Sequence, residues 1–128
     1  MLTARLKPVI WIASSKKDLK SFPDEVQHDV GTALTVAQYG GKAHNVKVMG
    51  GFGSGQVLDV LEDHQGNTYR AVYTVRFARA LVVLHCFQKK SKRGGEIPKE
   101  DKELIEKRLR DAESIYSQWL KLQDKAKP

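Results

Sequence analysis

Residues 68–93 read TYRAVYTVRFARALVVLHCFQKKSKR, and this stretch decides the fold. Residues 69–77 alternate apolar side chains with others, as a strand does, and residues 81–88 are almost continuously apolar, as a central strand is. Because only a short turn at residues 78–79 separates the two runs, they predict a β-hairpin. The stretch carries seven Lys/Arg and no Asp/Glu. Cations gathered at one end of a rigid sheet suit a partner with a polyphosphate backbone, which makes RNA the leading expectation.

The alternation in residues 69–77 places Arg70 and Arg76 on one strand face, which we expect to stay open while the opposite face packs. Hairpin strands run antiparallel, so Lys89 and Lys90 should emerge near Arg70. Arg76 lies six residues further on, roughly 20 Å along an extended strand, and cannot share a phosphate with Arg70. The sequence therefore predicts an anion-binding end at Arg70, Lys89 and Lys90.

The N-terminal half predicts a strand and two helices. Residues 8–13 (PVIWIA) favour a strand that is buried on both faces. Ser15-x-x-Asp18 and Ser21-x-x-Asp24 resemble capping boxes, and Pro23 fits the first position of the second helix. A buried stripe then recurs at helical spacing until Gly40-Gly41. Its members are Val26, Val30, Ala33, Leu34 and Ala37.

The remaining segments complete the predicted order of strand, helix, helix, three strands and helix. The glycines of residues 49–55 lack the Lys-Ser/Thr ending of a phosphate loop, so we interpret them as a connection. A strand at residues 57–61 and a polar loop at residues 62–67 follow. Pro98 opens an amphipathic helix with a frayed tail after Gln123. Its expected solvated face comprises Lys102, Glu106, Lys107, Arg108 and Arg110.

Composition fits one domain over residues 1–128, with a net charge of +7. Residues 1–64 hold seven Lys/Arg and seven Asp/Glu, while residues 65–128 hold fifteen and eight, so the positive excess lies in the second half. The single Cys86 excludes a disulfide framework. No secretion signal or membrane-length apolar run occurs, which predicts a soluble, cytoplasmic protein with no membrane partner.

The segments KPVIW, GFGSGQVLDVLED, YRAVYTVRF, LVVLHCFQKKSKRG and IPKEDKELIEKRL resemble the phage-derived, HigB-like branch of the RelE/ParE toxin superfamily of type II toxin–antitoxin systems. The resemblance implies an α+β, RelE-like fold in the order β-α-α-β-β-β-α. A mostly antiparallel sheet would be flanked by an N-terminal helical hairpin and a C-terminal helix. It also implies a ribonuclease that cuts mRNA in the ribosomal A site and a helix-turn-helix antitoxin as partner.

RNA cleavage without a metal or cofactor requires activation of a 2′-hydroxyl, stabilisation of a charged transition state and protonation of the 5′-oxygen. By resemblance, Arg70 and Lys90 flank the scissile phosphate and Lys89 contacts it. Arg76, Lys92 and Arg93 are the further RNA-binding candidates.

His85 is the general acid–base candidate because histidine titrates near neutrality, although a packed structural role competes. Asp59 or Glu62 offers a carboxylate for the 2′-hydroxyl proton, the alternative being solvated turn residues. The resemblance also implies lysines on the second strand and a C-terminal tyrosine, and the sequence offers only Tyr116 for the latter. Cys86 fits a core residue better than a nucleophile. The remaining histidines show no metal-ligand spacing, so no metal is expected.

Two classes of function remain open from the sequence. One is a ribosome-dependent mRNA endonuclease, which the basic hairpin favours. The other is a non-enzymatic toxin: either a ParE-like inhibitor of DNA gyrase or an RNA-binding module without cleavage. The strand predicted at residues 57–61 lacks the lysines that the resemblance implies, which favours this alternative.

Overall fold

The computed structural model describes residues 6–53, 56–89 and 97–126, and within them a five-stranded sheet carries three helices. The strand order is β1-β5-β4-β3-β2, with β1 parallel to β5 and the other neighbours antiparallel. The elements in chain order are β1 (Val9–Trp11), α1 (Ser15–Lys20), α2 (Asp24–Gln38), β2 (Val46–Val48), β3 (Val57–His64), β4 (Asn67–Thr74), β5 (Leu81–Lys89) and α3 (Lys99–Ala126). The expected α+β fold is confirmed, and β2 is added to the predicted element order.

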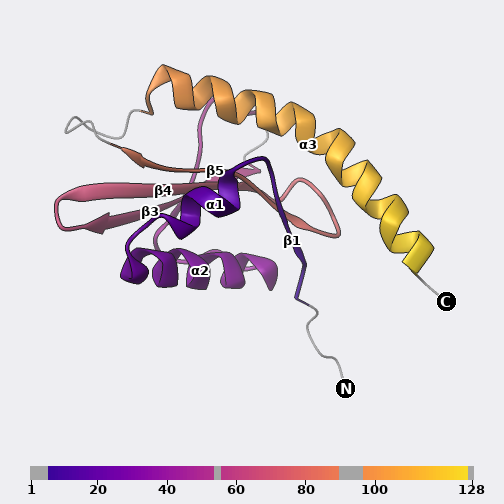
Figure 1. The fold of residues 1–128 in the computed structure, drawn as a ribbon, viewed down its shortest axis with the longest axis horizontal. Coiled ribbons are helices and arrows are strands. Elements are labelled where there is room, and N and C mark those ends of the chain that lie inside the picture. The colour runs from indigo at the N-terminus through magenta and orange to yellow at the C-terminus, as the bar shows by residue number, and fades with distance from the viewer. Residues whose placement is uncertain (1–5, 54–55, 90–96, 127–128) are drawn as a thin grey trace.

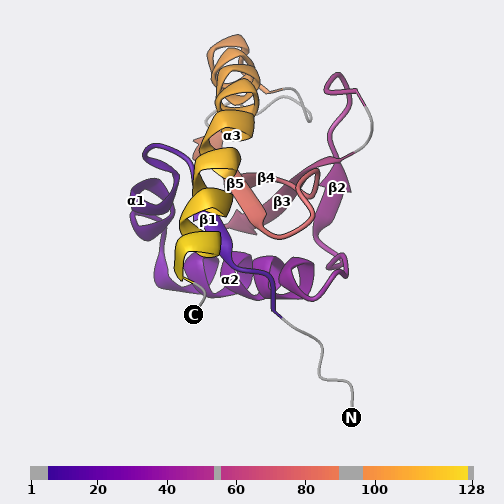
Figure 2. The ribbon, with the colours of Figure 1, turned by 90° about the vertical axis from the view of Figure 1, so that its right-hand side faces the viewer.

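Helices cover both faces of the sheet (Figure 1). α1 and α2 lie against one face, here called the helix-pair face, and α3 crosses the other, here called the α3 face (Figure 2). Each face has its own apolar cluster, with Val30, Val60 and Val83 in the first and Ile105, Val72 and Leu84 in the second. The prediction that the strand face carrying Arg70 stays open is therefore wrong, because that strand is β4 and α3 packs over this face.

The helical hairpin forms as predicted, but its helix starts differ. Ser14 is the N-cap of α1 and Pro23 is the N-cap of α2, and neither makes a side-chain cap hydrogen bond. Both predicted capping boxes are thus wrong, as is Pro23 at the first helical position. The reciprocal contact of a capping box uses the longer Glu or Gln side chain, which neither motif has. The predicted α2 stripe is confirmed, since all five of its members are buried.

The β3–β4 hairpin closes through two residues, Gln65 and Gly66, with φ of +48° and +80°. Positive φ at both central positions matches the twist of the flanking strands, and Gly66 adopts it without steric cost. The turn is shorter than the predicted polar loop because residues 62–64 still belong to β3 and Asn67 already belongs to β4. In the next connection, β4 ends at Thr74 instead of reaching Phe77.

The two shortest strands form the edges of the sheet. β1 is bordered by β5 alone. Ile10 is buried on the α3 face, as predicted, whereas Val9 and Trp11 pack on the helix-pair face but are only half-buried. β2 pairs with β3 and places Lys47 directly opposite Asp59. Lys47 thus lies on the added strand β2, whereas the strand predicted as the second, at residues 57–61, is β3 and carries no lysine.

α3 packs on the sheet through its N-terminal half and extends beyond the sheet through its C-terminal half, yellow in Figure 1. Ile105, Leu109 and Ala112 are buried as the stripe predicts, but so is Arg108, which was expected on the solvated face. The helix continues to Ala126, past the predicted start of the frayed tail. No helix within the described ranges is long and apolar enough to span a bilayer.

Candidate functional site

Strand register brings polar side chains together on the α3 face. Asp59 of β3, Val72 of β4 and His85 of β5 lie opposite one another across the three central strands. In the neighbouring row, Arg70 lies between Leu61 and Phe87. Asp59 and His85 are separated by two inter-strand spacings, roughly 10 Å between Cα atoms. A carboxylate and an imidazole therefore flank a position that Arg70 approaches from the next row.

Asp59 and Arg70 form a buried ion pair. Asp59 Oδ2 lies 3.4 Å from Arg70 Nη1, and both side chains are almost fully buried. Burial raises the pKa of Asp59 to about 7, outweighing the opposing charges of Arg70 and Lys47. Within the described part of the chain, Asp59 Oδ1 has no hydrogen-bond partner. Asp59 is thus a carboxyl group that titrates near neutrality and has one oxygen available.

A β-bulge determines which way His85 points. Val72 pairs with His85 but the next residue, Tyr73, pairs with Val83, so Leu84 is an extra residue in β5. Leu81 and Val83 pack on the helix-pair face, and strict alternation would send His85 there as well. The bulge shifts the register, so His85 faces α3 and Cys86 packs on the helix-pair face instead.

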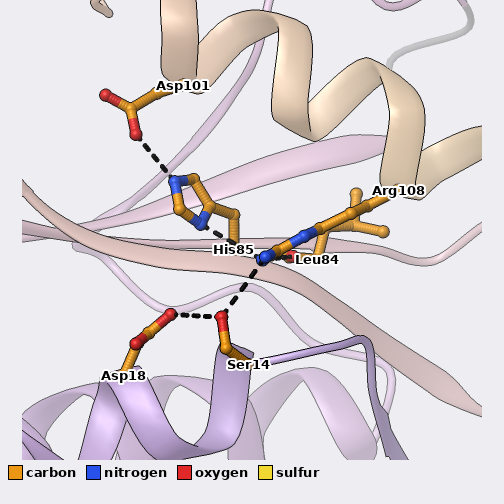
Figure 3. A network of polar contacts seen from close by, with 6 residues as sticks. All are labelled: Ser14, Asp18, Leu84, His85, Asp101 and Arg108. Carbon is orange, nitrogen blue, oxygen red and sulfur yellow. Dashed lines mark hydrogen bonds and ion pairs between the residues drawn. The ribbon is translucent and has the colours of Figure 1, made fainter.

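Contacts on three sides fix the His85 ring, and Figure 3 shows those to Asp101 and Arg108. Nε2 lies 2.7 Å from Asp101 Oδ1 on α3, and the ring stacks on Phe87 with centroids 4.6 Å apart. Nδ1 lies 3.3 Å from Arg108 Nη1. These contacts bear out a packed, hydrogen-bonded histidine, and they also place it on the same face as Arg70.

Arg108 connects α3 to β5 and to the start of α1 (Figure 3). Its Nη1 donates to the Leu84 carbonyl at 2.9 Å, and its Nη2 donates to Ser14 Oγ at 3.3 Å. Ser14 Oγ in turn donates to Asp18 Oδ2 at 2.7 Å. A single guanidinium thus links three elements that are far apart in the sequence.

The predicted site residues are partly brought together. Lys89 pairs with Thr68, two residues from Arg70, so Arg70, Lys89 and His85 share the α3 face. Arg76 follows the opposite end of β4 and lies away from them. All three grouped residues are nearly buried, with exposures of 5%, 4% and 6% for Arg70, Lys89 and His85. The other predicted basic residues, Lys90, Lys92 and Arg93, lie outside the described residues.

The sequence pattern missed Lys47, Asp101 and Arg108 as members of this region. Apolar residues on both sides of Lys47 were a signal for a short strand. Asp101 lies in the acidic first turn of α3, where its charge suits the helix dipole and gives no separate signal of a contact to the sheet. Arg108 lies one position before Leu109 and three after Ile105, within the buried side of the helix. Nothing in its residue type distinguishes it from its exposed neighbour Arg110.

Other candidates lie elsewhere. The hydroxyl of Tyr116 accepts a hydrogen bond from the Arg79 amide at 3.0 Å, in the turn before β5. Burial raises the pKa of Cys86 to about 12, so its thiol stays neutral and fits the core role. Glu62 accepts a hydrogen bond from Asn45 at 2.7 Å, and its pKa is raised, mainly by burial. Within the described residues, no three His, Cys, Asp or Glu side chains are grouped as a metal site would require.

Comparisons with known proteins place the chain in a family. Residues 17–110 match the family model described as phage-derived protein Gp49-like (DUF891). No curated protein and no solved structure matches the chain significantly. The matched range runs from α1 into α3 and includes every residue of the Asp59, Arg70 and His85 grouping. The chain therefore belongs to the phage-derived Gp49-like family, which is associated with RelE-like toxins of toxin–antitoxin systems.

Proposed function

We propose that this protein is the toxin of a type II toxin–antitoxin system and cuts ribosome-bound mRNA without a metal ion. Membership of a toxin-associated family supports the toxin role. The observation that carries the enzymatic part is the arrangement on the α3 face, where Asp59 and His85 flank Val72 and Arg70, in the next row, pairs with Asp59. Cleavage moves the phosphoryl group from the 5′-oxygen to the ribose 2′-oxygen, and a base, a cation and a hydrogen-bond donor to the leaving oxygen all assist that step.

The proposed reaction assigns one task to each side chain. Asp59 accepts the 2′-hydroxyl proton, and its pKa of about 7 suits a general base at neutral pH. The 2′-oxygen attacks phosphorus while the bond from phosphorus to the 5′-oxygen breaks. The neutral His85 ring donates a hydrogen bond from Nε2 to the departing 5′-oxygen, which takes its proton from water. Arg70 stabilises the added negative charge of the transition state. The products are a 2′,3′-cyclic phosphate and a 5′-hydroxyl end.

Basic residues near this centre supply RNA contacts. Lys89 lies diagonal to Arg70 on the same face, and Lys47 lies in the row of Asp59 at the exposed sheet edge. Lys90, Lys92 and Arg93 follow Lys89 in the sequence and are proposed as further RNA contacts by their charge alone. Arg76, beyond the other end of β4, is proposed to contact RNA away from this centre. Burial of the central head groups requires that RNA reach them through movement of the segments that cover them. The antitoxin, which the family association supports, is proposed to be the partner that competes for this surface.

The test is inducible expression followed by primer extension on cellular mRNA. The proposal predicts discrete cuts with 5′-hydroxyl ends, which accept phosphate from polynucleotide kinase without prior phosphatase treatment. His85→Gln removes the imidazole that donates to the 5′-oxygen and should slow cleavage by roughly 100-fold, the typical cost of losing one donor to a reacting oxygen. Arg110→Gln removes an exposed cation from α3 and is the matched control, with cleavage unchanged.

A second candidate is a toxin that binds without cutting, for which the observation is that Arg70, Lys89 and His85 are all nearly buried. A non-enzymatic toxin would use the polar groups of the α3 face only to hold α3 on the sheet. DNA damage with intact mRNA after induction would support gyrase inhibition. Arrest of translation with intact mRNA and undamaged DNA would support RNA binding alone.

A further inference from the structure

The side chain of Arg108 and the bulge at Leu84 have a joint effect on His85. The extra residue of the bulge, Leu84, has no partner in the neighbouring strand. Its backbone carbonyl instead accepts a hydrogen bond from Arg108 Nη1 at 2.9 Å. The same Nη1 lies 3.3 Å from His85 Nδ1. The nitrogen that stabilises the bulge therefore also contacts the ring that the bulge has turned toward α3.

A guanidinium can donate hydrogen bonds but cannot accept them. The ring nitrogen that faces Arg108 must then carry a lone pair, because a proton on Nδ1 would meet another donor. The remaining proton of a neutral imidazole lies on Nε2, where Asp101 Oδ1 accepts it at 2.7 Å. The charged groups that contact the ring, Arg108 and Asp101, thus select one tautomer between them.

We infer that Arg108 is a positioning residue for the reaction: it holds His85 in the neutral, Nε2-protonated tautomer, with the proton-bearing nitrogen directed toward Asp101 on the α3 face. This inference rests on the proposed function for its catalytic consequence, whereas the tautomer itself is a property of the folded protein alone. Ser14, oriented by Asp18, holds the other end of the guanidinium through Nη2. The position of Arg108 is consequently set by α1 as well as by α3.

The alternative is that Arg108 only holds α3 on the sheet. Two features indicate that it also positions His85. A guanidinium that only joined α3 to the sheet would be satisfied by the Leu84 carbonyl and by Ser14. The third contact, to His85 Nδ1, adds little holding strength at 3.3 Å but does determine the protonation site. The His85 ring is also stacked on Phe87 at an interplanar angle of 13°, which holds the plane of the ring while Arg108 faces its Nδ1.

The first measurement is the 15N spectrum of the His85 ring in the wild-type protein and in Arg108→Met. We expect wild-type Nδ1 to show the shift of an unprotonated nitrogen and Nε2 that of a protonated one. In Arg108→Met, Asp101 still accepts from Nε2 but Nδ1 no longer faces a donor, so the Nδ1 signal should move toward that of a protonated nitrogen. Arg108→Lys retains a cationic donor and should restore the wild-type pattern in part. A wild-type ring protonated on Nδ1 would overturn the inference.

The second measurement is mRNA cleavage by the same proteins, with Arg110→Met as the matched helix control. Arg108→Met should reduce the cleavage rate by roughly 10- to 100-fold, as expected when a catalytic group is displaced, while Arg108→Lys recovers part of it. Thermal unfolding of each variant separates a loss of fold from a loss of positioning. Equal cleavage by wild type and folded Arg108→Met would refute the positioning role. A wild-type protein that shows the expected tautomer but cuts no RNA would refute the proposed function instead.

Discussion

The two faces of the sheet differ in what they bury. The helix-pair face packs an almost wholly apolar cluster between the strands and the first two helices. The α3 face buries a comparable apolar cluster, but Asp59, Arg70, His85 and Arg108 are buried on that side as well. Buried charges rarely stabilise a fold more than apolar residues of the same volume would. The helix-pair face therefore reflects what folding requires, and the α3 face carries groups that folding alone does not explain.

The largest stability effect should come from breaking the ion pair on the α3 face. Arg70→Met leaves Asp59 buried without its cationic partner, which should lower the free energy of unfolding by about 3–5 kcal/mol. Urea denaturation at pH 8 measures the change, because Asp59 is then largely ionised. A loss below 1 kcal/mol would show that water or another group compensates the carboxylate, and the contrast between the faces would weaken.

The pH dependence of stability should differ between wild type and Asp59→Asn. The folded protein raises the pKa of Asp59 from 3.8 to about 7, so this carboxyl binds its proton more tightly when folded. Its contribution to stability is complete below about pH 4 and is lost as the pH rises to about 7. The loss amounts to about 4 kcal/mol at most. Unfolding free energies across this range should fall more steeply for wild type, and parallel curves would contradict the assignment.

A cavity on the helix-pair face should affect stability without a specific effect on function. Leu34 of α2 is 4% exposed, and Leu34→Ala should cost about 3 kcal/mol. The fraction of protein that remains folded should cut RNA at the wild-type rate, which is measured by dividing the cleavage rate by the folded fraction. A rate lowered beyond that fraction would mean that this face also shapes the reaction.

The smallest effect should come from the link between the two layers. Ser14→Ala removes one hydrogen bond to Asp18 and one from Arg108, at a cost of about 1 kcal/mol. Arg108 keeps its contacts to β5, so the His85 tautomer should be retained. Thermal unfolding and the His85 15N spectrum check the two parts of this prediction separately. A change of tautomer would place Ser14 among the residues that position the ring.

Much of the fold followed from local patterns. The alternation in residues 69–77 and the apolar run in residues 81–88 produced the β4–β5 hairpin, and its antiparallel register placed Lys89 near Arg70. The α2 stripe was correct for the same reason, since a 3.6-residue period reports directly on burial. Such signals depend on neighbouring residues alone, which is why a single sequence contains them.

The candidate site was harder to predict from the sequence, because its geometry depends on contacts between distant segments. Alternation directs His85 to the helix-pair face, and only the bulge at Leu84 reverses this. Arg108 was assigned to solvent because its burial depends on a carbonyl that the same bulge leaves outside the ladder. Asp59 was weighed as a solvated turn residue although the strand predicted at residues 57–61 contains it, because its burial depends on pairing with Arg70 of the neighbouring strand. Each of these errors traces to a tertiary feature that leaves no periodic signal.

The most direct test of the central claim replaces the ion pair by apolar residues of similar size, in the double variant Asp59→Leu with Arg70→Met. If the α3 face holds these charges for catalysis, this variant should be at least as stable as wild type and should leave induced cells with intact mRNA. A folded double variant that cuts mRNA at the wild-type rate would contradict the account, because the reaction would then proceed without the carboxyl and the cation assigned to it.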